Sequence, residues 1–310
     1  MALHPAIKTL LDQVAAQGSP PLSSQGVELV RQGYVATRGF LSEKPDVANV
    51  EDRVIPGPAG DIPVRIYTPD GVAPYPVLVY YHGGGWVIGS IETHDGICRA
   101  YANAAGCIVV NVDYRLAPEH RFPAAVDDAF AVLNWVAEHA ADFGGDPSRM
   151  AVGGESAGAN LSAVIAQLAT EAGRPALKYQ ILAYPVTNLA FDTESYETNA
   201  DGYFLTQESM RWFWDLYLND ESEGADPKAS PLLREDVSGL PSGIVITPEY
   251  DPLRDEGIAY GRRLKEAGVD FEVWVPDGMI HEFLGMTNIL PEAKQAIETL
   301  GGKLRTAFAT

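Results

Sequence analysis

A serine between small residues follows a short apolar segment near the middle of the chain. The sequence around it is Gly154-Glu155-Ser156-Ala157-Gly158, after the apolar run 150–153 and before apolar positions that recur at helical spacing over 159–170. Gly-x-Ser-x-Gly between a strand and a helix is typical of a sharp turn that exposes a nucleophilic serine, because side chains at the two glycines would collide with the neighbouring strand or helix. Small-residue turns containing serine are also common in proteins without this chemistry, so the partners of Ser156 decide the interpretation.

A serine hydroxyl becomes a good nucleophile only when a base accepts its proton, and the resulting imidazolium needs an oriented carboxylate. In hydrolases with this turn, the residues follow the chain in the order serine, acid, histidine. His281 is the only histidine after Ser156, and it stands in the loop-like stretch 277–283 beyond the last predicted strand. We therefore expect His281 to be the base.

Three carboxylates compete for the role of the acid. Asp251 directly follows the predicted strand 243–247, and its alternative role is to cap the next helix, with Pro252 at the first helical position. The two roles are compatible. Asp255 lies one turn into that helix and is expected to point away, and Asp277 lies on the histidine's own loop. Asp251 is the favoured acid.

Acyl transfer also needs hydrogen-bond donors for the oxygen that becomes negatively charged. A glycine triplet directly follows the apolar strand 76–81, in the sequence His82-Gly83-Gly84-Gly85-Trp86. Glycines let backbone N–H groups face a substrate, and the N–H of Ala157 adds a donor at a helix N-terminus. The triplet alone is also compatible with a flexible loop or a phosphate-binding loop, but no Gly-Lys-Ser/Thr or Gly-x-Gly-x-x-Gly spacing accompanies it. We expect His82 to brace this loop rather than to act in catalysis.

Strand and helix patterns alternate along most of the chain, which predicts an α/β fold with a mostly parallel sheet and helices on both faces. The segment 76–81 is apolar almost throughout, as expected of a central strand. The two strands 50–55 and 63–67 are predicted to form an antiparallel hairpin. The other predicted strands are 107–113, 149–152, 179–184, 243–247 and 270–275, and the predicted helices are 95–105, 123–141, 159–170, 252–267 and 291–308.

Two segments interrupt this alternation. Helical patterns over 3–14 and 27–40, separated by a break at 18–24, precede any strand and must cover something built later. Between 185 and 241 no convincing strand is found, but 209–218 is helical and rich in aromatic residues. We interpret these segments as a cap over the carboxyl ends of the strands, where α/β enzymes bind ligands. For the N-terminal helices, a packing arm or a dimer contact is an equally good interpretation.

The composition limits the classes of function. The chain has 310 residues and a formal net charge of −20, which disfavours nucleic acids and anionic membranes as partners. Its two cysteines, Cys98 and Cys107, predict no disulfide framework, and no metal-ligand spacing is found. No signal sequence or apolar run of transmembrane length is present, so we expect a soluble, cytoplasmic protein with no membrane insertion. Four histidines are expected to be ordinary polar residues: His4, His94, His120 and His139.

Taken together, the motifs resemble the hormone-sensitive lipase-like carboxylesterases (family IV) of the α/β-hydrolase fold, from about residue 50 to the C-terminus. The resemblance implies an α/β-hydrolase fold of about eight strands, N-terminal cap helices over 1–45 and a catalytic domain over 46–310 with a cap insertion at about 187–225. It implies the triad Ser156, Asp251 and His281, oxyanion donors at Gly84, Gly85 and Ala157, and support from Gly83. It also implies no cofactor or metal, and a homodimer in many members. The motifs that carry it are His82-Gly83-Gly84-Gly85-Trp86, Asp113-Tyr114-Arg115-Leu116-Ala117-Pro118-Glu119, Gly154-Glu155-Ser156-Ala157-Gly158, Asp251-Pro252-Leu253-Arg254-Asp255 and His281-Glu282-Phe283.

Two residues depart from the family pattern, Glu155 where aspartate is common and Glu282 where glycine is common. A carboxylate beside His281 could raise its pKa or alter the acyl pocket. The sequence predicts a carboxylesterase for small esters of short to medium acyl chains, whose activity falls below roughly pH 6–7 as the base is protonated. The alternatives are an amidase or peptidase with the same triad, and a non-catalytic small-ligand receptor. Candidate pocket residues are Trp86, Glu155, Tyr34, Phe204 and Trp212.

Overall fold

The computed structural model of the protein describes residues 2–18 and 20–310. Met1 and Ser19 fall within the predicted range 1–45, and Ser19 also within the predicted break at 18–24; both lie outside the described residues. The helix before this break ends at Gln17 and is capped by Gly18, whose φ of 61° is the left-handed conformation that glycine adopts without strain.

The described residues form one eight-stranded sheet in the order β1-β2-β4-β3-β5-β6-β7-β8. The first two strands form an antiparallel hairpin, β2 pairs antiparallel with β4, and the strands from β4 to β8 are parallel to one another. The predicted fold class, α/β with a mostly parallel sheet and an N-terminal hairpin, is therefore confirmed. The strands are β1 (Asn49–Gly57), β2 (Gly60–Thr68), β3 (Tyr75–Tyr81), β4 (Ile108–Val112), β5 (Gly145–Glu155), β6 (Leu177–Ala183), β7 (Gly243–Ile246) and β8 (Phe271–Trp274).

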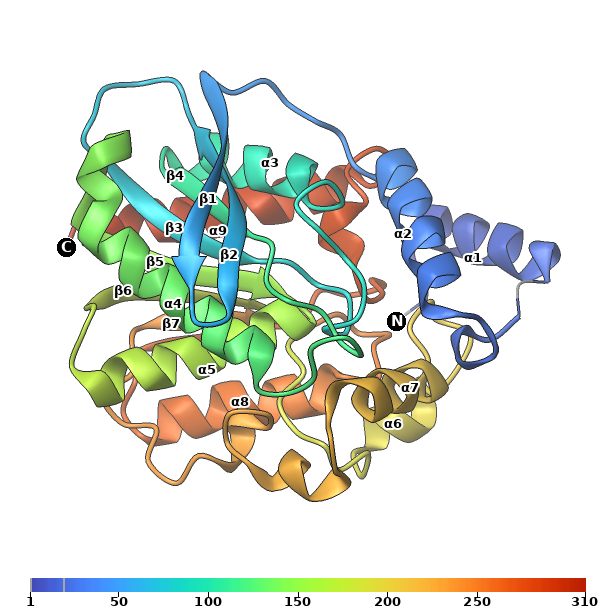
Figure 1. Cartoon of the computed structure of the whole chain (residues 1–310). Coiled ribbons are helices and arrows are strands. Elements are labelled where there is room, and N and C mark those ends of the chain that lie inside the picture. The colour runs from blue at the N-terminus through green and yellow to red at the C-terminus, as the bar shows by residue number, and fades with distance from the viewer. Residues whose placement is uncertain (1, 19) are drawn as a thin grey trace.

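Helices cover both faces of the sheet (Figure 1). The helices α3 (Asp95–Ala105) and α9 (Pro291–Phe308) lie on one face, and both match their predicted bounds. On the other face lie α4 (Ala124–His139), α5 (Ala157–Ala172) and α8 (Arg254–Glu266).

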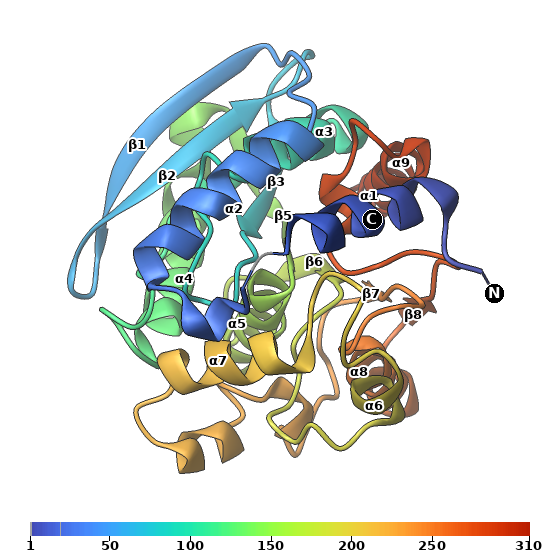
Figure 2. The ribbon, with the colours of Figure 1, turned by 90° about the vertical axis from the view of Figure 1, so that its right-hand side faces the viewer.

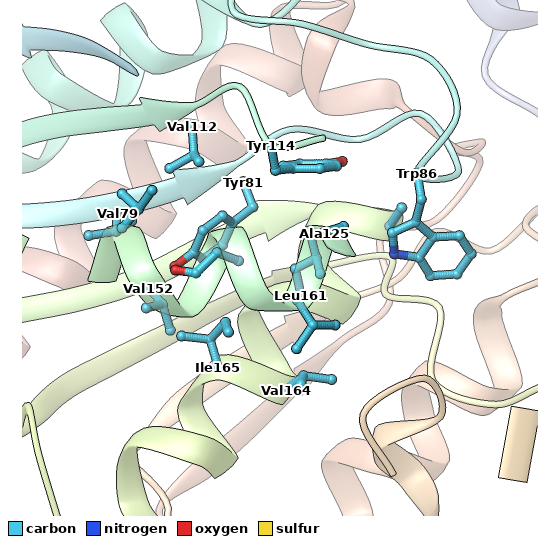
Figure 3. Close-up of a cluster of buried hydrophobic side chains, with 14 of the residues drawn as sticks. Val79, Tyr81, Trp86, Val112, Tyr114, Ala125, Val152, Leu161, Val164 and Ile165 are labelled. Atoms are coloured by element: carbon cyan, nitrogen blue, oxygen red, sulfur yellow. The ribbon is translucent and has the colours of Figure 1, made fainter. Parts of the chain in front are cut away.

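Alternate side chains of the central strand β3 enter two different cores, because successive residues of a strand point to opposite faces. Val79 and Tyr81 pack with residues of α5, and Figure 3 shows them beside Leu161 and Ile165. The intervening Tyr80 packs with residues of α3 and α9. This explains why the sequence 76–81 is apolar almost throughout.

The strand β5 is longer than predicted. It begins at Gly145 rather than at 149, because Gly145 pairs with Tyr75 of β3. The register then shifts, and the pairing resumes with Met150 opposite Val77. The polar residues at the start of this strand are partly exposed. The apolar pattern in the sequence therefore predicted only the buried second half of the strand.

Four helices gather at the ends where the parallel strands finish (Figure 2). Two are N-terminal, α1 (Pro5–Gln17) and α2 (Val27–Leu41), and two belong to the interval between β6 and β7, α6 (Glu194–Thr198) and α7 (Gln207–Tyr217). As predicted, residues 185–241, all of which are described, contain no strand. Short 3₁₀ turns complete the chain: η1 (Leu22–Ser24), η2 (Ala140–Phe143), η3 (Glu221–Ala225), η4 (Pro231–Leu233) and η5 (Phe283–Gly285). No helix in the described part of the chain is both long and apolar enough to cross a membrane.

Candidate active site

Ser156 occupies a strained turn between β5 and α5. Its backbone has φ 55° and ψ −122°, a conformation rarely adopted by a residue with a side chain. A Cβ atom at Gly154 or at Gly158 would collide with the carbonyl oxygen of Tyr81 on the neighbouring strand. The two glycines are therefore required for the close approach of this turn to β3, and the turn holds the serine at the carboxyl end of the sheet.

His281 and Asp251 complete a continuous hydrogen-bonded chain with this serine. His281 Nε2 lies 3.0 Å from Ser156 Oγ, and His281 Nδ1 lies 2.7 Å from Asp251 Oδ2. All three residues are at most 5 % exposed. The structure thus brings together the three side chains that were predicted to act together, although 125 residues separate the serine from the histidine in sequence.

Asp251 also organises the start of the following helix. Its other carboxylate oxygen accepts a hydrogen bond from the Leu253 N–H at 2.8 Å. One carboxylate therefore both orients the histidine and caps the start of the segment that leads into α8. The amide of Asn199, from the segment after α6, donates to the Asp251 carbonyl at 3.2 Å. Asp255 instead accepts from the Ser195 N–H at 2.8 Å, which confirms that it points away, and no hydrogen bond joins Asp277 to His281 in the described structure.

The environment of His281 favours its protonated form. Burial lowers the pKa of His281, but the charge and the hydrogen bond of Asp251 outweigh burial, and the pKa lies above its ordinary value. Glu282 and Glu155 add smaller effects in the same direction. The expected influence of the carboxylate beside His281 is therefore present, but Asp251 contributes more.

The glycine loop lies against the serine turn. A Cβ at Gly83 would contact Glu155 and come within 3.5 Å of Ser156 Cβ, and Gly84 and Gly85 have φ of 119° and 58°. Among the described residues, no acceptor is found for the backbone N–H of Gly84, Gly85 or Ala157. The N–H of Gly83, by contrast, points at His94 Nε2 at 3.2 Å, so Gly83 has a partner within the protein.

His82 braces this loop, as predicted. Its Nδ1 lies 2.8 Å from the Gly83 carbonyl oxygen, and its ring stacks on Tyr114 with 4.3 Å between ring centroids. The Tyr114 hydroxyl in turn donates to the His82 carbonyl at 2.7 Å. The helix α7 closes the loop from the other side, because a Cβ at Gly85 would collide with the ring of Phe213.

A buried polar cluster surrounds Glu155, the residue before Ser156. Glu155 is 1 % exposed, and its carboxylate contacts Arg38 Nη2 at 2.8 Å, His94 Nε2 at 2.5 Å and the Tyr184 hydroxyl. Burial raises the pKa of Glu155, but the charge of Arg38 and the contact with His94 outweigh burial and hold it well below its ordinary value. Burial and the charge of Arg38 lower the pKa of His94 to about 4.

Sequence reasoning missed this cluster. His94 was expected to be an ordinary polar residue, but it is fully buried and contacts Glu155, so that expectation was wrong. Arg38 lies in a helical pattern with other charged residues and carries no motif. The one available signal was that the N-terminal helices must cover something built later in the chain.

The predicted pocket aromatics occupy different environments. Trp86 is fully buried and stacks on Tyr217 with 4.1 Å between ring centroids, so its ring is not exposed to solvent in this structure. Tyr34 is partly buried and donates to Glu282 at 2.9 Å. Phe204 and Trp212 are partly buried in separate parts of the helical cover. Three of them, Trp86, Tyr34 and Trp212, belong to one hydrophobic cluster, whereas Phe204 packs against another.

Comparison with known proteins places this geometry in a family. Residues 78–285 match the family model described as alpha/beta hydrolase fold. The chain is 41 % identical to carboxylesterase NlhH of Mycobacterium tuberculosis, over 95 % of this chain and 92 % of that protein. It is 46 % identical to carboxylic ester hydrolase LipN of the same organism, over 77 % of this chain, but it spans only 65 % of LipN.

Solved structures agree with the sequence comparisons. The hyperthermophilic esterase from the archaeon Pyrobaculum calidifontis is 41 % identical, superposes with a TM-score of 0.96 and is covered completely, as is this chain. A likeness of this extent includes the sheet, the covering helices and the loops that carry the site. The chain therefore belongs to the hormone-sensitive lipase-like (family IV) carboxylesterases of the α/β-hydrolase superfamily.

Proposed function

We propose that this protein is a serine carboxylesterase that hydrolyses small esters of short to medium acyl chains. The observation that carries the proposal is the hydrogen-bonded chain from Ser156 Oγ through His281 to Asp251, at 3.0 and 2.7 Å. Relatives named as carboxylesterases and esterases over nearly the whole chain support the same reaction.

In the proposed mechanism, Ser156 Oγ attacks the ester carbonyl carbon while His281 Nε2 accepts the hydroxyl proton. Asp251 holds the imidazole with Nδ1–H toward its carboxylate and stabilises the imidazolium. The N–H groups of Gly84, Gly85 and Ala157, for which the described part of the chain offers no acceptor, stabilise the negative oxygen of the tetrahedral intermediate.

Collapse of this intermediate breaks the ester C–O bond, and His281 returns the proton to the alcohol that leaves. A water then attacks the acyl-enzyme, with His281 again accepting a proton, and a second collapse releases the acid and regenerates Ser156. Gly83 supports the loop from its position against Glu155 and is not a donor in this scheme, because its N–H faces His94.

We also propose that residues 1–45 and about 187–225 act as the cap of a catalytic domain over 46–310. The position of their helices at the ends of the parallel strands supports this division (Figure 2). Tyr34, Phe204 and Trp212 remain proposed pocket residues, whereas the complete burial of Trp86 favours a core role for its ring. A homodimer and a cytoplasmic location also remain predictions.

The test is a series of p-nitrophenyl esters from acetate to palmitate, assayed with the wild type and with Ser156→Ala. We expect serine-dependent turnover that peaks at short or middle chain lengths. A peak at the longest chains would indicate a lipase. Absence of turnover by folded wild-type protein would contradict the proposal and favour the amidase or receptor alternatives.

A further inference from the structure

Arg38, on the N-terminal helix α2, contacts carboxylates next to both the nucleophile and the base. Its Nη2 lies 2.8 Å from Glu155, the residue before Ser156, and its Nη1 lies 3.6 Å from Glu282, the residue after His281. Its Nε donates to the Thr93 carbonyl at 3.2 Å. Each guanidinium nitrogen therefore faces a different segment of the catalytic domain.

The surroundings of this side chain are built to hold it. Arg38 is 2 % exposed, although it comes from a helix whose other side faces solvent. A Cβ at Gly285, in the turn that follows His281, would collide with its guanidinium, so the backbone of that turn lies directly against the cation. A planar group with several donors suits two carboxylates at different angles, whereas a lysine ammonium is a compact point charge.

Two tyrosines also bind the carboxylates that Arg38 contacts, and one of them packs on the base. The Tyr184 hydroxyl donates to Glu155, while its ring packs on the His281 ring with 4.7 Å between centroids. The Tyr34 hydroxyl, also from α2, donates to Glu282 at 2.9 Å. The charged and titratable groups around Arg38 include Glu155, Glu282, Tyr34, Tyr184 and His94, which come from five different segments of the chain.

We propose that Arg38 is a positioning residue, which holds Ser156 and His281 at reacting distance by binding the carboxylates that adjoin them in sequence. The cap helix α2 is then part of the catalytic geometry and not only a cover over the substrate. This inference rests on the proposed function, since it concerns the geometry of the same triad. Arg38 itself touches neither Ser156 nor the imidazole in the described contacts.

The test compares Arg38→Lys and Arg38→Met with the wild type in hydrolysis of p-nitrophenyl butyrate, with folding checked by circular dichroism. A displaced nucleophile or base slows the chemical step, so we expect kcat to fall by about tenfold to a hundredfold in both variants while KM changes by less than about threefold. A folded Arg38→Lys variant with wild-type kcat would overturn the inference.

A double-mutant cycle keeps the inference testable if Arg38→Met does not fold. Glu282→Gln retains an acceptor for Tyr34 and removes one charge that Arg38 binds. If Arg38 acts through Glu282, the effects of Arg38→Lys and Glu282→Gln on kcat are non-additive, because each removes the same contact. Additive effects would contradict positioning through Glu282.

Arg31 provides a matched control on the same helix. It joins α2 to the catalytic domain through the Val87 carbonyl at 2.9 Å and through Glu119. We expect Arg31→Lys to lower kcat clearly less than Arg38→Lys. An equal loss of kcat would show that Arg38 only attaches α2 to the catalytic domain and does not position the triad.

Ser156→Ala in the same assay separates the two proposals. If that variant stays active, the proposed function fails, whereas if it is inactive and Arg38→Lys resembles the wild type, only the inference about Arg38 fails.

Discussion

His281 and His94 are both buried and both lie within hydrogen-bonding distance of a buried carboxylate, yet their pKa values move in opposite directions. The Asp251 partner raises the pKa of His281, whereas burial and Arg38 lower that of His94 to about 4 despite its contact with Glu155. In both regions the carboxylate favours imidazolium. Near His94, however, the guanidinium of Arg38 binds the same carboxylate, and its positive charge opposes a second cation.

The difference teaches which buried histidine can act as a base. A general base needs a pKa near the working pH, so that it is neutral before the reaction and can hold a proton during it. Asp251 raises the pKa of His281, so the imidazolium that forms there is stabilised, whereas burial and Arg38 lower the pKa of His94 to about 4 and disfavour its protonation. His94 therefore belongs to the scaffold of the site.

The largest expected effect on kcat comes from replacing each of the two histidines in turn. His281→Ala should lower kcat by about 10⁵-fold, since the serine loses its base. His94→Asn should lower kcat by no more than about a hundredfold, because general-base catalysis stays intact. Steady-state kinetics on p-nitrophenyl butyrate measure both values. Comparable losses from the two substitutions would remove the distinction between base and scaffold.

The second prediction compares the two carboxylates. Asp251→Asn should lower kcat by about 10⁴-fold, because an amide cannot stabilise the imidazolium and favours the wrong tautomer. Glu155→Gln should cost far less activity and should act mainly on stability, since it removes the closer of the two carboxylate charges that the buried Arg38 contacts. Kinetics together with urea unfolding measure the two effects. A larger kinetic loss for Glu155→Gln than for Asp251→Asn would show that the acid is wrongly assigned.

The third prediction concerns pH. Protonated His281 cannot accept the serine proton, so kcat/KM should fall as the pH decreases through a midpoint above the ordinary histidine pKa of about 6.5. His94 should remain neutral until the pH approaches 4. A pH–rate profile and an NMR titration of the imidazole resonances give the two values. An acid limb below the ordinary histidine pKa would contradict the role of Asp251.

The same shifts affect stability with opposite signs. Because the folded pKa of His281 is raised, its contribution is complete below the unfolded pKa and is lost as the pH rises through the folded pKa. Because the folded pKa of His94 is lowered, the folded state loses stability as the pH falls from about 6.5 toward 4. Urea unfolding from pH 4 to 8 should show the acid-side loss, which His94→Asn should reduce.

The smallest expected effect comes from Gly285→Ala. The added methyl group would displace the Arg38 guanidinium and cost about 1–3 kcal/mol in free energy of unfolding by overpacking. Since Arg38 lowers the pKa of His94, moving the guanidinium away should raise that pKa. Denaturant unfolding and NMR titration measure these changes. The control is Gly302→Ala on α9, where an added Cβ would make only an ordinary contact, 3.6 Å from Arg305 Nη2. An unchanged His94 pKa in a destabilised variant would break the link between Arg38 and His94.

The sequence alone determined the alternation of strands and helices, the serine turn and the three side chains proposed as the triad. Each rests on a local rule, such as the two glycines that let the turn approach β3, or on a fixed order along the chain. The cluster of Arg38, Glu155, His94 and Glu282 was decided only by the tertiary structure. Its members lie on segments separated by up to 244 residues, and no periodicity links them. Their roles follow from burial and from the partner that each charge meets, and both depend on where α2 packs across the finished sheet.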